Sequence, residues 1–291
     1  MSAEPVPNRC EVHTLADGRR ISWREYGDPR GAPVLWNHGG LVLGRDVSLA
    51  DGPARDLGLR IVAPDRPGIG DSDPQPGRDT VMWAADAAEL LDSLGVGAFG
   101  VLGWSLGGEY ALACGARLAP RVTRVGVIAG TLSMNDPTAF AQLNGLDRAF
   151  SRVCGRSAPA GTAMFAAVRL AARARPATYQ RRSAKGLGTA DADVISRLPP
   201  GSFAAWNAAA MAHPRGMVEE YRAMVRPWGF TLGEVAVPVD LWQGDLDHMV
   251  PARWAHRLAE QLPDAALHFV RGAGHFLAYD RWPEVLAPFT E

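Results

Sequence analysis

The chain has 291 residues, a formal net charge of −1 and 47% hydrophobic residues, which together predict a soluble globular protein with a substantial core. Its nearly balanced charge favours a small-molecule substrate, and we expect no nucleic-acid or membrane partner. The only lysine, Lys185, lies outside any Gly-Lys-Ser/Thr sequence, which excludes a P-loop. Length alone allows two domains or one core with a large insertion, and it leaves the oligomeric state open.

The three cysteines, Cys10, Cys114 and Cys154, are far apart and form no Cys-x-x-Cys or Cys/His pattern. We therefore expect neither a disulfide framework nor a zinc site, and the sequence indicates no cofactor. The first ten residues contain Pro5 and Pro7 and lack the apolar core of a signal peptide. No apolar run long enough to span a bilayer follows, so we predict a cytoplasmic protein.

Short apolar segments of strand length predict a β-sheet. A first pair of segments, residues 12–15 and 21–26, flanks the turn Asp17-Gly18, which is typical of an antiparallel hairpin. The later segments are apolar on both faces, as in a parallel sheet that helices cover on each side. These later segments are residues 33–36, 59–63, 99–102, 125–129, 237–242 and 266–270. Together they predict a mostly parallel, eight-stranded sheet.

Helical periodicity lies between these segments. Residues 83–94 place apolar side chains at helical spacing, with Asp79 as a candidate N-cap and Gly95 as a stop signal. Residues 106–114 repeat the pattern. The order strand, helix, strand predicts right-handed crossovers and a doubly wound α/β fold.

Residues 134–230 interrupt the alternation with helical signals only. Because most connections are a few residues long, we predict a helical cap inserted into a core of residues 1–133 and 231–291. Asp136 followed by Pro137 predicts a helix start, and helical spacing continues to Phe150. The sequence Pro-Pro-Gly at 199–201 should break the cap, and Ser202 should restart a helix.

Residues 103–107 read Gly-Trp-Ser-Leu-Gly and join a predicted strand to a predicted helix. A lone match to five residues would be common by chance, but this context is that of the Gly-x-Ser-x-Gly nucleophile elbow. The glycines permit a sharp turn that lifts Ser105 above the carboxyl edge of the sheet. The adjoining helix N-terminus favours an anion there.

A serine hydroxyl needs a base, and a carboxylate and a histidine should follow it along the chain. Asp245 and Asp247 come after one predicted strand, and His275 comes after the next. Since the carboxyl ends of parallel strands meet at one edge, these side chains should converge on Ser105. Asp136 is a third possible acid, although a helix cap explains it better.

With these motifs the chain resembles the α/β-hydrolase superfamily, specifically its cap-bearing esterases, lactonases and peptidase-like members. The resemblance covers nearly the whole chain outside the cap. Its five ordered motifs are His-Gly-Gly at 38–40, Asp-Arg-Pro-Gly-Ile-Gly-Asp-Ser at 65–72, the elbow at 103–107, Gly-x-x-Asp-x-x-Val-Pro at 244–251 and Gly-x-Gly-His at 272–275. The resemblance implies the α/β-hydrolase fold and a catalytic triad of Ser105, Asp247 and His275, because the family acid is the Asp of Gly-x-x-Asp.

The resemblance also implies an oxyanion hole formed by the backbone N–H groups of Gly40 and Leu106. His38 is expected to support that loop and not to act as a base. Epoxide hydrolases and dehalogenases are excluded, because those relatives carry aspartate at the elbow.

No motif identifies the substrate. We predict a mostly apolar pocket lined by Trp104, Leu41, Phe140 and Trp206, although aromatic residues at helix spacing are also typical of a helical core. The leading prediction is a serine hydrolase that forms an acyl-enzyme on a small ester, lactone or thioester.

Three alternatives stay open. The same triad could serve a lyase, an acyltransfer or cyclisation, or a perhydrolase or haloperoxidase reaction. An aminopeptidase-like hydrolase would need an acidic anchor for the substrate amine, and Glu219 and Glu220 are the carboxylate pair of the cap. A binding protein without activity is disfavoured because all three triad residues are present.

Overall fold

The protein is described by a computed structural model that covers residues 10–290. We interpreted the first ten residues as lacking a signal peptide. Residues 1–9 of this segment lie outside the described part of the chain. Between residues 10 and 290, no helix is both long enough and apolar enough to cross a bilayer.

Eight strands form one sheet in the order β1-β2-β4-β3-β5-β6-β7-β8. Their bounds are β1 Glu11–Thr14, β2 Arg20–Gly27, β3 Ala32–Asn37, β4 Leu59–Pro64, β5 Phe99–Trp104, β6 Val122–Ile128, β7 Val239–Gly244 and β8 Ala265–Val270. The β1–β2 hairpin is antiparallel, β2 also runs antiparallel to β4, and the other neighbours are parallel. The mostly parallel, eight-stranded sheet predicted from the sequence is confirmed.

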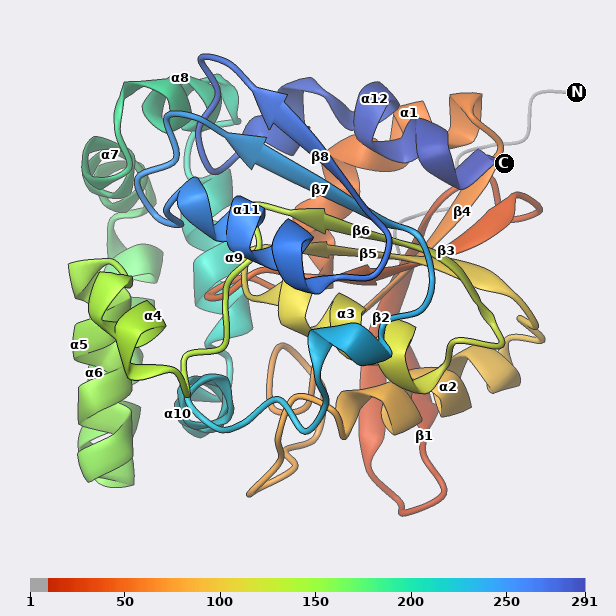
Figure 1. Ribbon diagram of the computed structural model, residues 1–291. Coiled ribbons are helices and arrows are strands. Elements are labelled where there is room, and N and C mark those ends of the chain that lie inside the picture. Colours follow the sequence, from red (N-terminus) through yellow and green to blue (C-terminus); the bar gives the residue numbers. More distant parts are fainter. Residues whose placement is uncertain (1–9, 291) are drawn as a thin grey trace, which may run out of the picture.

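Helices cover both faces of the sheet, with α1 and α12 on one face and α2, α3 and α11 on the other (Figure 1). Their bounds are α1 Asp51–Asp56, α2 Trp83–Ser93, α3 Gly107–Arg117, α11 Arg253–Gln261 and α12 Trp282–Leu286. Short 3-10 helices are η1 Gly44–Ala50, η2 Leu232–Glu234, η3 Leu277–Asp280 and η4 Ala287–Thr290. Every residue of the central strands β5 and β7 is buried, which explains their continuous apolar sequences.

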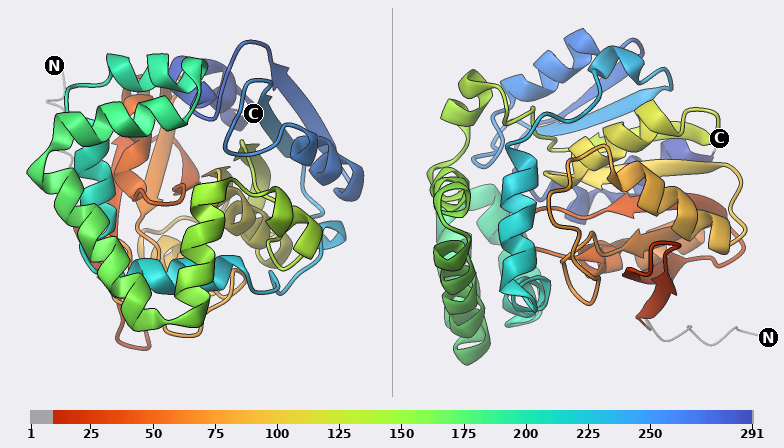
Figure 2. Two further views of the ribbon diagram at one scale, coloured as in Figure 1. Left: turned by 90° about the vertical axis from the view of Figure 1, so that its left-hand side faces the viewer. Right: turned by 90° about the horizontal axis from the view of Figure 1, so that it is seen from below.

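All the remaining helices lie between β6 and β7, in the interval for which a cap was predicted. Their bounds are α4 Pro137–Gln142, α5 Gly145–Arg156, α6 Ala158–Ala174, α7 Pro176–Gly186, α8 Thr189–Arg197, α9 Ser202–Ala210 and α10 Pro214–Met224. They stand beyond the carboxyl ends of the parallel strands, and the two further views show them gathered at that edge of the sheet (Figures 1 and 2).

Several local predictions are confirmed and one is wrong. Gly95 ends α2 with φ +68°, Asp136 caps α4, and Ser202 restarts the chain as α9. The helix expected to continue from residue 136 to residue 150 breaks after α4, because the Asn144 side chain caps a new helix by accepting a hydrogen bond from the Asp147 N–H (3.0 Å). Helix α2 begins at Trp83, and Asp79 accepts a hydrogen bond from the Met82 N–H at 3.1 Å in the turn that leads into it.

Candidate active site

Ser105 lies on the sharp turn between β5 and α3, with a φ of +56°. Such a left-handed conformation is strained for a residue with a Cβ and persists only where its surroundings enforce it. The surroundings here are crowded backbone: a Cβ at Gly103 would overlap the Gly107 carbonyl, and a Cβ at Gly107 would overlap that of Asn37. The two glycines of the predicted elbow are therefore required by close backbone approach.

Asp247 and His275 are in direct contact at the same edge of the sheet. The His275 Nδ1 lies 2.9 Å from the Asp247 Oδ2. The other carboxylate oxygen accepts hydrogen bonds from the backbone N–H groups of Met249 and Val250, both at 2.8 Å. The carboxylate is thus held from two sides and oriented toward the imidazole.

The two other aspartates considered from the sequence have different partners. The exposed Asp245 accepts a hydrogen bond from the Gly272 N–H at 2.7 Å, on the loop that follows β8. Asp136 accepts one from the Thr138 N–H at 2.8 Å, as the N-cap of α4. Of these three aspartates, Asp247 alone pairs with His275.

Electrostatics favour a charged acid beside a basic imidazole. Burial disfavours the ionised form of Asp247, but the His275 charge and the hydrogen bonds from His275 and two backbone N–H groups hold its pKa below the usual value. Burial likewise opposes protonation of His275, yet the charge and hydrogen bond of Asp247 raise the pKa of His275 above its ordinary value. Asp247 is therefore ionised near neutral pH.

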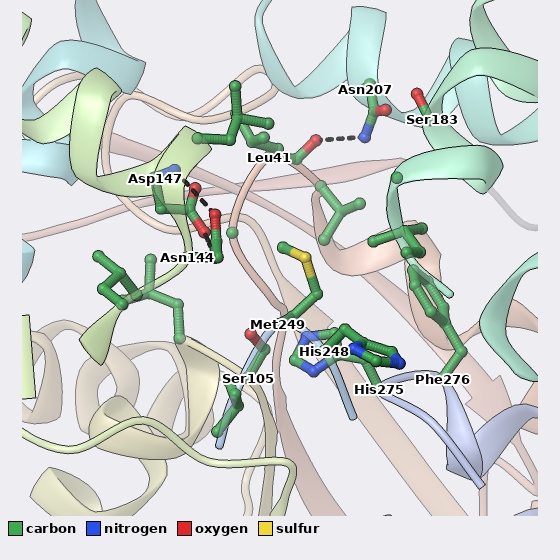
Figure 3. Close-up of a pocket in the computed structure, with 18 of the residues that line it drawn as sticks. Leu41, Ser105, Asn144, Asp147, Ser183, Asn207, His248, Met249, His275 and Phe276 are labelled. Carbon is green, nitrogen blue, oxygen red and sulfur yellow. Dashed lines mark hydrogen bonds between the residues drawn. The ribbon is translucent and has the colours of Figure 1, made fainter. Parts of the chain in front are cut away.

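Ser105 and His275 line one cavity of about 410 Å³ beneath the helices that follow β6 (Figure 3). Gly40 and Leu106, the residues predicted to donate to an oxyanion, line it as well. A Cβ at Gly40 would lie 3.7 Å from the Leu106 side chain, so the two residues are neighbours in the cavity wall.

Trp104 and Leu41, which we predicted to contact substrate, also line this cavity. Trp104 has a second contact: its indole N–H donates to the His275 carbonyl at 3.0 Å, and the two rings lie 5.3 Å apart. Leu41 has a φ of +60°, and its carbonyl accepts a hydrogen bond from the Asn207 amide of α9 at 2.7 Å (Figure 3).

Phe140 and Trp206 do not line the cavity, which corrects the sequence prediction. Helix α9 presents Asn207 to the cavity, and Trp206 points about 100° away from it around the helix. Trp206 is buried and packs near Tyr279, with ring centroids 6.4 Å apart. The chain turns between α4 and α5, and the Arg152 guanidinium lies over the Phe140 ring, 5.9 Å from the ring centroid.

His38 supports the loop that follows β3, as the resemblance implied. It is fully buried, its Nδ1 lies 2.8 Å from the Gly39 carbonyl, and its Nε2 lies 3.2 Å from the Arg66 N–H. Burial and the nearby Arg66 charge hold the pKa of His38 well below its ordinary value. A neutral imidazole with both nitrogens engaged is a structural element of this loop.

Asp147 of α5 is a cavity residue that sequence reasoning missed. Its carboxylate accepts hydrogen bonds from the Tyr221 hydroxyl at 2.5 Å and from the Asn144 amide at 2.7 Å; Figure 3 shows the contact with Asn144. No Arg, Lys or His within residues 10–290 forms an ion pair with it. The only signal in the sequence was a charged residue within an apolar helical spacing.

Asp191 of α8 was also missed. It is fully buried, and its Oδ1 accepts a hydrogen bond from the Phe276 N–H at 2.9 Å. A Cβ at Gly274 would overlap the Asp191 carboxylate, which explains the glycine directly before His275. Burial raises the pKa of Asp191, although hydrogen bonds from the backbone of Phe276 and His275 oppose the rise.

Glu220 of α10 links the helical segment of residues 134–230 to Arg66, which lies on the loop after β4. It is buried and forms ion pairs with the buried Arg66 and Arg78. Arg66 also donates to the carbonyls of His38 (2.5 Å) and Gly39 (3.1 Å). Burial opposes ionisation, but the two guanidinium groups lower the pKa of Glu220 to about 2.

Neither carboxylate of the Glu219–Glu220 pair lines the cavity, so the amine anchor considered from the sequence is not available there. Glu219 pairs instead with Arg222 at 3.2 Å. In the described part of the chain, no group of three or more His, Cys, Asp or Glu side chains could hold a metal ion.

A doubly wound sheet with a strained serine at a strand end, followed by an aspartate and a histidine after later strands, defines a class of α/β enzymes. The chain belongs to the α/β-hydrolase fold family, whose model matches residues 32–281. This confirms the superfamily suggested by the motifs.

Sequence matches to individual proteins cover less than half of the chain. The chain is 33% identical to a non-heme chloroperoxidase of Streptomyces lividans over 37% of this chain and 39% of that protein. It is 31% identical to a proline iminopeptidase of Neisseria gonorrhoeae over 45% of this chain and 42% of that protein. The matches thus span about two fifths of each relative. An esterase structure from Thermogutta terrifontis superposes with a TM-score of 0.68 at 20% identity, covering 96% of both chains, and shows the shared fold.

Proposed function

We propose that this chain is a serine hydrolase acting on small, mostly apolar carboxylic esters, lactones or thioesters. The observation that carries the proposal is the 2.9 Å contact between Asp247 and His275, together with the cavity that His275 and the strained Ser105 both line. Membership of the α/β-hydrolase fold family supports it.

In this mechanism His275 removes the proton from the Ser105 hydroxyl as the oxygen attacks the acyl carbon. Asp247 holds the Nδ1–H tautomer and stabilises the imidazolium that forms. The N–H groups of Gly40 and Leu106 donate to the developing oxyanion. His275 then protonates the leaving group, and water, activated by the same imidazole, releases the acid from the acyl-enzyme.

We also propose that residues 134–230 act as a cap that decides specificity. Supporting this, the helices in this interval contribute Leu146, Ser183, Phe203 and Tyr221 to the cavity wall. The core would then supply the chemistry, and the cap would supply the shape of the substrate site.

The decisive experiment is labelling with a fluorophosphonate, followed by a panel of p-nitrophenyl esters, lactones and thioesters. We expect Ser105 to be labelled, Ser105→Ala to remain unlabelled, and at least one class of substrate to be hydrolysed. Labelling without turnover on any of them would favour a non-hydrolytic use of the triad. An unlabelled wild-type protein would contradict the proposal.

A second candidate, an aminopeptidase-like hydrolase, is favoured by Asp147. This carboxylate lines the cavity with two neutral partners, Tyr221 and Asn144, and a substrate ammonium group would complement its charge. The iminopeptidase relative is consistent with this activity. Hydrolysis of prolyl p-nitroanilide that falls sharply in Asp147→Asn would support it, and no hydrolysis would exclude it.

A further inference from the structure

A second cavity of about 630 Å³ adjoins the one that contains Ser105. We call it the trough. The two cavities share five lining residues, which are Leu41, Leu146, Tyr179, Arg182 and Ser183. The trough is therefore continuous with the catalytic cavity of the proposed function and extends it outward among α5, α6 and α7.

The walls of the trough are mainly apolar. Helix α6 contributes a stripe of small and aliphatic side chains at helical spacing: Ala167, Val168, Leu170, Ala171 and Ala174. Leu170 is 68% exposed and Leu146 is 55% exposed, so both are large apolar side chains without cover. A chain of methylene groups lying between them would remove this surface from water.

The segment around the trough is strongly basic. Residues 148–190 contain nine Arg and Lys and no Asp or Glu, so their formal charge is +9 while the whole chain carries −1. The rest of the protein therefore carries −10. None of the nine forms an ion pair with a carboxylate in the described part of the chain. They are Arg148, Arg152, Arg156, Arg169, Arg173, Arg175, Arg181, Arg182 and Lys185.

Two of these cations line the trough itself. Arg182 lies where the trough meets the catalytic cavity, and Arg175 lies seven residues earlier, at the start of α7. On one face of a helix this spacing corresponds to about 10 Å. Neither guanidinium group donates a hydrogen bond to another side chain or carbonyl among residues 10–290, so both are free for an anion.

We propose that the trough binds an apolar arm of the substrate that ends in an anionic group, either a carboxylate or a phosphate, held by Arg175 and Arg182. This rests on the proposed function in one respect: the other end of the arm lies at Ser105. An arginine fork suits both anions because it presents several N–H donors in one plane.

Asp147 does not oppose this assignment. It lines the catalytic cavity but not the trough, and it lies on the opposite side of that cavity from Ser183 (Figure 3). Its carboxylate is engaged by Tyr221 and Asn144, whereas Arg175 and Arg182 line the trough. An anionic terminus in the trough would therefore meet the two arginines and not Asp147.

The kinetic test compares two acyl arms of equal length, the p-nitrophenyl ester of octanoate and the mono-p-nitrophenyl ester of octanedioate, whose arm ends in a carboxylate. The p-nitrophenyl ester of 8-(phosphonooxy)octanoate tests the other anion, a phosphate at the end of the same kind of arm. The preference is the ratio of kcat/KM for an anionic substrate to kcat/KM for the neutral ester. We expect the double variant Arg175→Gln and Arg182→Gln to lower this ratio about tenfold for one of the two anionic substrates, since each exposed ion pair contributes up to about 1 kcal/mol. High salt should reduce the same preference.

The matched control is Arg156→Gln combined with Arg173→Gln. It removes the same charge from the same exposed helical segment, but neither residue lines the trough. An equal loss of preference in both double variants would show only a general field of the basic segment and would overturn the assignment of Arg175 and Arg182. Equal rates for anionic and neutral substrates in the wild type would overturn it as well.

Binding separates this proposal from the proposed function. Calorimetric titration of Ser105→Ala with octanoate and with octanol needs no turnover. Octanoate should bind more tightly than octanol, and adding Arg175→Gln and Arg182→Gln should remove the difference. Loss of catalysis with intact octanoate binding would contradict the hydrolase assignment alone. Absence of octanoate binding, or protein that sediments with phosphatidylglycerol vesicles but ignores octanoate, would overturn the trough proposal.

Discussion

The sheet with its covering helices and the helical segment of residues 134–230 organise function in different ways. The sheet sets the positions of Ser105, Asp247 and His275 through its backbone, because each follows the carboxyl end of a parallel strand. The helical segment contacts the loops of the core through single buried carboxylates: Asp191 binds the Phe276 N–H beside His275, and Glu220 pairs with Arg66 on the loop after β4.

This difference explains what each region reveals in its sequence. A backbone-defined site needs particular residues at particular spacings, such as the glycines around Ser105, and so leaves a motif. A contact made by one side chain across the fold leaves none, since any helix can carry an aspartate or a glutamate. The following experiments test whether the two regions are as separable as this comparison implies.

The largest expected effects come from the sheet region. Ser105→Ala and His275→Ala should each lower kcat by about a millionfold, as residues of a triad act as a unit. The double variant should be hardly slower than either single one. Steady-state kinetics on the best ester of the panel measures all three, and additive losses would argue against a shared mechanism.

The acid of the triad is tested by a pair of isosteric changes. Asp247→Asn should lower kcat by about 10⁴, because the wrong imidazole tautomer would face Ser105. Asp245→Asn, two residues away and bonded to Gly272, should cost far less. Equal losses, or the reverse order, would mean that Asp245 is the acid in solution.

Most of the sheet could be predicted from sequence because strands buried on both faces are apolar throughout, as β5 and β7 are. The order of motifs at strand ends predicted that an aspartate after β7 meets His275, and the resemblance to the α/β-hydrolases selected Asp247 over Asp245. The break between α4 and α5 could not be predicted, because the apolar spacing continues through it and the new helix is marked only by the Asn144 cap.

The same limit applies to the cavity. Phe140 and Trp206 looked suitable by residue type, but which side of a helix faces the cavity depends on how α4 and α9 dock. The net charge was equally uninformative, because the total of −1 includes a charge of +9 in residues 148–190. Its distribution became meaningful only when the trough placed Arg175 and Arg182 beside apolar walls.

Glu220 tests how strongly the two regions depend on each other. Glu220→Gln leaves the buried Arg66 and Arg78 without their anion and should cost about 3–5 kcal/mol of unfolding free energy. Glu219→Gln, which removes one partly exposed pair, should cost less than about 1 kcal/mol. Urea denaturation measures both values, and similar costs would contradict a linking role for Glu220.

The same residue predicts a pH dependence. Because the pKa of Glu220 is lowered from 4.5 to about 2, its contribution to stability is present above pH 4.5 and is lost as the pH falls toward 2. The Glu220→Gln protein should show a smaller loss of stability across that window. Melting temperatures from pH 2 to pH 6 test this, and parallel curves for the two proteins would refute it.

Asp191 should have a smaller effect, on the pH profile of catalysis. Its charge adds to that of Asp247 in raising the pKa of His275, so Asp191→Asn should move the acid limb of kcat/KM to lower pH. The weakened hold on the His275 turn should cost about fivefold at the optimum. The control is Asp193→Asn, an exposed residue on the same helix. Identical acid limbs in wild type and Asp191→Asn would leave Asp191 a purely structural residue.

The smallest expected change in activity separates packing from recognition within the helical segment. Trp206→Ala should cost about 3–5 kcal/mol of stability, because a buried aromatic ring is removed. It should leave the ranking of ester chain lengths unchanged, since Trp206 lies outside the cavity. Leu146→Ala, at a half-exposed residue shared by the cavity and the trough, should cost little stability. It should lower kcat/KM for octanoate relative to acetate esters several-fold, in line with about 0.8 kcal/mol per methylene left exposed. If Trp206→Ala reordered the substrates and Leu146→Ala did not, the substrate would lie against α9 and not along the trough.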